Sequence, residues 1–133
     1  MTEDMIDLGR RAVACKGWRW MPGMLVVPNE HMVSVPLRLT DDHDWPHDLG
    51  LRLPDFHDPA TVGCLLALVR DAYRDPSKLW RGHVEVRRDH RILFFVVSFR
   101  HDASGALVED TLASGGTEAE ALVCALKAAE ASP

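Results

Sequence analysis

The segment from Arg91 to Phe99 constrains the fold most strongly, because it is apolar on both faces of the strand that its composition predicts. Side chains of a strand alternate between its two faces. The apolar residues of one face are Ile92, Phe94 and Val96, and those of the other are Leu93, Phe95, Val97 and Phe99. A strand that is apolar on both faces needs cover on both. Either helices lie on both faces of the sheet, or one face is buried against a second subunit.

Three other segments have the apolar periodicity and the end signals of helices. They cover about residues 2–16, 58–73 and 117–129. Asp58 followed by Pro59 is an N-cap with proline at the first helical position. Thr117 and Glu120 form a Thr-x-x-Glu capping box, which is typical of a helix start.

Extended segments fill most of the remaining chain. They are residues 18–27, interrupted by Pro22-Gly23, and residues 32–39, 84–88, 91–99 and 106–110. The sequence therefore predicts one α+β domain over residues 1–133, with three helices and an antiparallel sheet of about four to five strands. The expected order is α-β-β-α-β-β-α, and an α/β/α sandwich is one way to arrange it. Residues 40–57 are expected to form a long acidic loop, either mobile or functional.

Composition excludes several classes of protein. The formal net charge of −5 does not favour nucleic-acid binding. The longest apolar runs, such as 92–97, are far shorter than the roughly 20 residues that span a bilayer. The N-terminus is acidic, unlike that of a signal peptide, so we expect a cytoplasmic protein. Cys15, Cys64 and Cys124 have neither disulfide-framework nor metal-site spacing, which indicates small buried side chains.

The acidic stretch from Asp41 to Asp48 supplies oxygen and imidazole groups within one segment. With His43, His47 and His57 it could hold a divalent metal ion. Pro46 disfavours the helix that would bring His43 and His47 to one side. A solvated loop and a partner-binding loop are the alternatives.

No catalytic motif is present in the sequence. The serines have no Gly-x-Ser-x-Gly context, and there is no Walker A sequence. Residues 114–117, Ser-Gly-Gly-Thr, could hold an anion at a helix start, but a glycine turn before a cap is common. We therefore expect a protein that is not an enzyme and has no cofactor.

Tryptophan and arginine occur together at two places. Trp18-Arg19-Trp20 puts two indoles on one side of an extended segment, and Trp80-Arg81 precedes a basic hairpin. Indoles stack on bases and guanidinium groups pair with phosphates, so these residues could hold a nucleotide. The candidate ligand-binding residues are Trp18, Arg19, Trp20, Trp80, Arg81 and Arg87. In the alternative, the tryptophans anchor the core and the arginines line a solvated sheet edge.

Three features in order resemble a known family. The first helix ends at Gly17-Trp18, and a middle helix runs from Asp58 to Tyr73. The last helix, rich in Ala and Leu, starts with the sequence Thr-Glu-Ala-Glu-Ala-Leu of residues 117–122. In this order and spacing the chain resembles small tailed-phage and prophage proteins with a phage ABA sandwich domain. The resemblance implies a helix–sheet–helix sandwich, a phage or prophage origin and no known catalytic residues. Some small phage proteins of similar build sequester nucleotide signals of bacterial immunity, which is an analogy of fold and origin.

These observations lead to three functional expectations. The first is a phage or prophage accessory binding protein in the host cytoplasm, which sequesters a small nucleotide-like or anionic ligand and forms a homo-oligomer through its apolar sheet face. The second is an interaction module that modulates a host protein through the acidic segment 41–58. The third is a metal-dependent enzyme that uses His43, His47 and His57.

Overall fold

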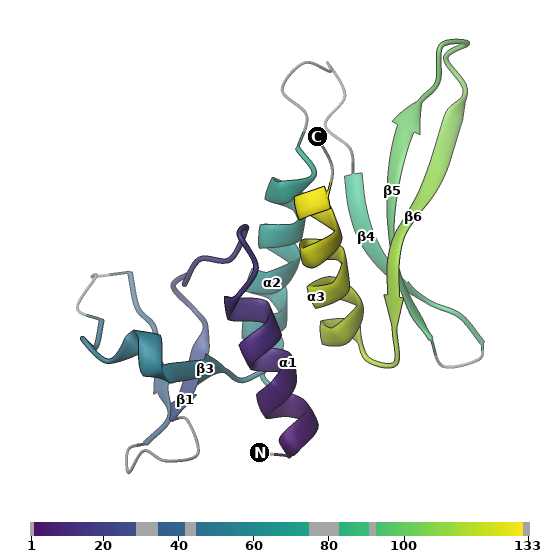
Figure 1. Cartoon of the computed structure of the whole chain (residues 1–133). Helices are drawn as coiled ribbons and strands as arrows, with labels where there is room; N and C mark the ends of the chain where they lie inside the picture. Colours follow the sequence, from purple (N-terminus) through teal and green to yellow (C-terminus); the bar gives the residue numbers. More distant parts are fainter. Residues whose placement is uncertain (1, 29–34, 42–44, 75–82, 91–92, 132–133) are drawn as a thin grey trace.

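The computed structural model describes residues 2–28, 35–41, 45–74, 83–90 and 93–131, which Figure 1 shows as a cartoon. Within these ranges the helices are α1 (Glu3–Val13), α2 (Pro59–Ala72) and α3 (Glu118–Ala128). The strands are β1 (Leu25–Pro28), β2 (Leu37–Arg38), β3 (Arg52–Pro54), β4 (His83–Arg88), β5 (Phe94–His101) and β6 (Leu107–Gly115). Two short 3-10 helices are η1 (Leu49–Leu51) and η2 (Ala129–Ala131).

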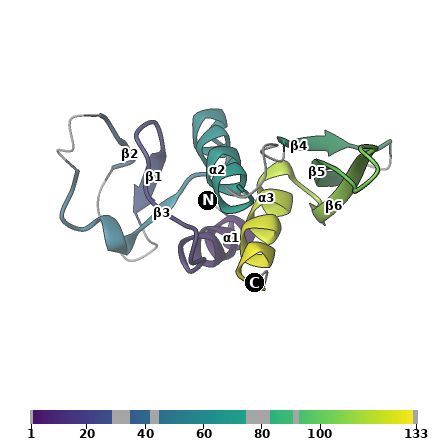
Figure 2. The same cartoon turned by 90° about the horizontal axis from the view of Figure 1, so that it is seen from above.

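The strands form two antiparallel sheets of three strands each, in the orders β2–β1–β3 and β4–β5–β6. Seen from above, the three helices form a layer between the two sheets (Figure 2). The predicted α+β class with three helices is thus confirmed within the described residues. The single sheet of four to five strands and the α/β/α sandwich are wrong, because here the helices lie inside and the sheets outside. Periodicity identifies strands but not their partners, which are set by contacts between distant segments.

Residues 40–57, predicted as one long acidic loop, contain η1 and β3. β3 pairs with β1 in antiparallel register, with Val26 opposite Pro54. All three residues of β3 are buried, and Leu53 and Pro54 lie next to Gly9 of α1. A strand of three residues is too short to show alternation in the sequence. Within the described residues the observed order is therefore α-β-β-β-α-β-β-β-α, in which β3 has no predicted counterpart and β6 corresponds to the predicted segment 106–110.

The three predicted helix starts are confirmed. The side chains of Thr2, Asp58 and Thr117 each accept a hydrogen bond from the backbone N–H three residues further on, at 3.3, 3.0 and 3.1 Å. Each bond satisfies one of the N–H groups that a helix leaves without an internal partner. Local chemistry thus sets where each helix begins.

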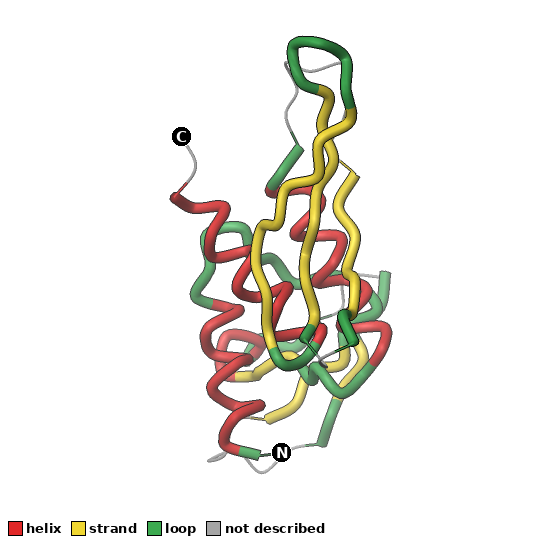
Figure 3. Tube along the Cα trace, turned by 90° about the vertical axis from the view of Figure 1, so that its right-hand side faces the viewer, coloured by secondary structure: helices red, strands yellow, loops and turns green. Residues whose placement is uncertain are grey.

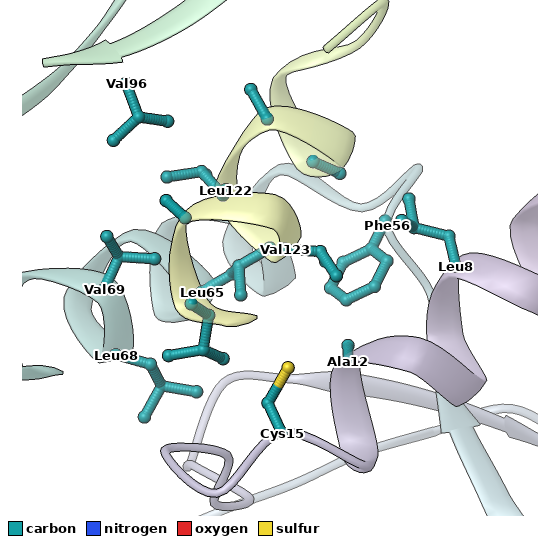
Figure 4. Packing of buried hydrophobic residues seen from close by; sticks show 14 of the residues in the cluster. Leu8, Ala12, Cys15, Phe56, Leu65, Leu68, Val69, Val96, Leu122 and Val123 are labelled. Carbon is teal, nitrogen blue, oxygen red and sulfur yellow. The ribbon is translucent and has the colours of Figure 1, made fainter. Parts of the chain in front are cut away.

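The core lies where the helices meet each other and the two sheets. Leu122 and Val123 of α3 face Leu65 and Val69 of α2, and Val96 of β5 approaches from the sheet side (Figure 4). Buried residues from the rest of the chain complete the cluster, namely Leu8, Ala12, Cys15, Met24, Val26, Leu39, Phe56 and Val84. One hydrophobic cluster therefore joins both sheets to the helix layer.

A polar network fixes the β2–β1–β3 sheet to the start of α2. Arg38 of β2 makes two hydrogen bonds to the Asp58 carboxylate, at 2.9 and 2.8 Å, and a third to the Gly23 carbonyl at 2.7 Å. Thr61 is fully buried, donates its hydroxyl to Asp58 at 2.8 Å and accepts the N–H of Leu25 at 2.8 Å. Asp58, which caps α2, therefore also links α2 to the β2–β1–β3 sheet.

In the second sheet, β5 is the central strand, and the β5–β6 hairpin extends past the ends of the helices (Figure 3). A register shift between Val96 and Val97 leaves Leu112 of β6 without an opposite residue. This bulge interrupts the alternation of β6. For that reason the sequence predicted only residues 106–110 as the last strand, whereas β6 continues to Gly115.

Candidate binding face

Two of the predicted ligand-binding residues belong to an aromatic cluster against the core. Trp18 contacts Trp20 edge to face, with ring centroids 5.2 Å apart, and contacts Phe56 in the same way at 6.4 Å. Trp18 and Trp20 both pack against the hydrophobic cluster. The indole N–H of Trp18 is buried and has no hydrogen-bond partner among the described residues. The indoles do lie on one side, as predicted, but that side faces the core.

The two predicted arginines that the structure describes, Arg19 and Arg87, have carboxylate partners. Arg19 lies at the surface and pairs with Asp71 of α2 at 3.1 Å. Arg87 lies on β4, with α2 and α3 between it and the loop that carries Trp18 and Trp20 (Figures 1 and 2). The structure does not bring these residues together into one site. Trp80 and Arg81 lie outside the described residues.

The face of β4–β5–β6 that is turned away from the helices is here called the outer face. Its residues alternate with those that face the core, and they are Glu85, Arg87, Phe95, Val97, Phe99, His101, Leu107, Glu109, Thr111 and Ser114. No helix or second sheet of the described chain covers the outer face (Figures 2 and 3). The strand with two apolar faces thus has helices on one side only.

Charged side chains shield the middle of the outer face. The Arg87 guanidinium pairs with Glu85 at 2.7 Å and with Glu109, across the sheet, at 2.8 Å. It also lies 5.0 Å from the centre of the Phe99 ring, within the range of a cation–π contact. Val97 is only 3% exposed, because the long side chains lie over it. The hydrogen bond to Glu85 raises the pKa of Arg87.

The two ends of the outer face are more exposed than its middle. Leu107 of β6 is 59% exposed, and Leu93, just before β5, is 42% exposed. Between them lies a shallow hollow of about 350 Å³. Its lining residues are Arg87, Arg88, Asp89, Phe95, Val97, Glu109 and Thr111. Two cations, two anions and three uncharged side chains make this hollow close to neutral.

The acidic segment and its histidines do not form a metal centre within the described residues. No group of three His, Cys, Asp or Glu residues there could hold a metal ion. His47 and His57 are exposed, and His43 lies outside the described residues. Several carboxylates of this segment have structural partners instead. Asp48 pairs with the buried Arg52 at 3.2 Å, and Asp55 accepts the backbone N–H of His57 at 2.9 Å.

The glycine turn before α3 is explained by packing. A Cβ added at Gly115 would lie 2.6 Å from the backbone N of Ala121 and 3.0 Å from the backbone of Glu120. Gly115 therefore allows β6 to approach the first turn of α3 closely. Gly116, the next residue, has no such contact, since its nearest neighbour would be the Glu120 carboxylate at 3.8 Å.

The three cysteines are free. Cys15 is buried, as predicted, whereas Cys64 and Cys124 are half-buried. Burial raises the pKa of the Cys15 and Cys64 thiols and so disfavours their thiolate forms at neutral pH.

Comparison with known proteins gives no match to a family model, to a curated protein or to a solved structure. None of the described helices has the length and hydropathy of a membrane span. The assignment to phage or prophage proteins therefore stays a prediction that rests on Gly17-Trp18, the helix from Asp58 to Tyr73 and residues 117–122.

Sequence reasoning found Arg87 and the apolar faces of β5, but it missed the ion triad. Glu85 is two residues from Arg87, whereas Glu109 is 22 residues away, on a strand whose register only the folded sheet defines. The alternation of Leu93, Phe95, Val97 and Phe99 was the signal that could find the outer face.

Proposed function

We propose that this chain is a non-catalytic binding protein whose contact surface is the outer face and whose partner is a protein. The main support is that β5 is apolar on both faces while the described helices cover only one. Apolar strips left at a surface and rimmed by polar groups are typical of protein–protein contacts. The phage or prophage origin and the host target remain part of this proposal only as expectations from the sequence.

Charge favours a protein partner over a small anionic ligand at this face. An anion beside Arg87 would also meet Glu85 and Glu109, which already neutralise the guanidinium at 2.7 and 2.8 Å. Arg19, the other described arginine of the predicted site, is paired with Asp71. Removing these partners would cost the hydrogen bonds that they make. Both described arginines of the predicted nucleotide site, Arg19 and Arg87, therefore already have carboxylate partners.

A matched pair of leucine substitutions tests the proposal. Leu107 on the outer face is 59% exposed, and Leu51, beside the other sheet, is 62% exposed. Neither change to Glu should alter folding, because substitutions of exposed residues usually change stability by less than about 0.5 kcal/mol. Immobilised wild-type protein, Leu107→Glu and Leu51→Glu are compared as baits in a bacterial lysate.

We expect proteins that are retained by the wild type and by Leu51→Glu and are lost with Leu107→Glu. Equal retention by all three baits would contradict a role for the outer face. A nucleotide-like compound released from the purified protein by heat, and detected by mass spectrometry, would instead favour the small-ligand function.

A further inference from the structure

We draw no further inference here: the strongest candidate, the shallow hollow beside Arg87 on the outer face of β4–β5–β6, belongs to the surface already described, and nothing in the described part of the chain shows what covers it.

Discussion

At the residue scale, Asp58 does more than begin a helix. It caps α2, binds the Arg38 guanidinium through both oxygens and accepts the hydroxyl of the buried Thr61. The hydrogen bonds from Arg38 hold the pKa of this carboxyl well below its usual range, with a smaller contribution from Thr61. One side chain therefore couples the edge strand β2 to the start of α2.

Replacing Asp58 by Ala is expected to lower the free energy of unfolding by about 2 kcal/mol, because the helix cap and a charged hydrogen bond are both lost. Asp58→Asn keeps a capping oxygen and should cost less. Urea denaturation at pH 7 measures both changes. An Ala variant as stable as the wild type would show that the network around Asp58 does not contribute to stability.

The same side chain predicts a pH dependence. Because the folded pKa of Asp58 is lowered, its stabilisation is complete above the unfolded value of about 3.9 and is lost as the pH falls towards the folded value. The stability difference between wild type and Asp58→Asn should thus be constant from pH 7 to about pH 5 and shrink below about pH 4. A difference that stays constant down to pH 3 would contradict this assignment.

At the element scale, the junction between β6 and α3 depends on one glycine. Gly115→Ala would force a Cβ to within 2.6 Å of the backbone of α3, so either the strand or the helix must shift. We expect Gly115→Ala to cost about 2 kcal/mol, as for other substitutions that overfill a packed site. Gly116→Ala is the matched control, and it should change stability by less than about 0.5 kcal/mol. Thermal unfolding, monitored by circular dichroism, measures the stability change of each variant.

At the scale of the whole molecule, the layering predicts how stability is distributed. The helices α2 and α3 lie between the two sheets and carry most of the fully buried side chains, whereas the tip of the β5–β6 hairpin lies beyond them (Figure 3). Amides of α2 and α3 should therefore exchange with deuterium more slowly than those of residues 101–107. Hydrogen-exchange mass spectrometry measures this, and equal protection in both regions would contradict a core centred on the helix layer.

Local signals in the sequence determined where the helices begin and which segments are most strongly extended. The N-caps at Thr2, Asp58 and Thr117, and the two strands around residues 84–88 and 91–99, depend on residues close together in the chain. The two-sided apolar pattern of β5 predicted cover on both of its faces; the described helices lie on one face only, and cover of the other face by a second molecule stays a prediction.

Only the tertiary structure decided how these elements are layered and what the outer face contains. The short β3, the separation into two sheets and the central helix layer follow from packing between distant segments, which no local pattern records. Likewise, Arg87 meets Glu109 only because β4 and β6 lie on either side of β5. A strand's own residues show that it needs cover, but they do not show which residues or which molecule supplies it, because those contacts exist only in the folded or assembled state.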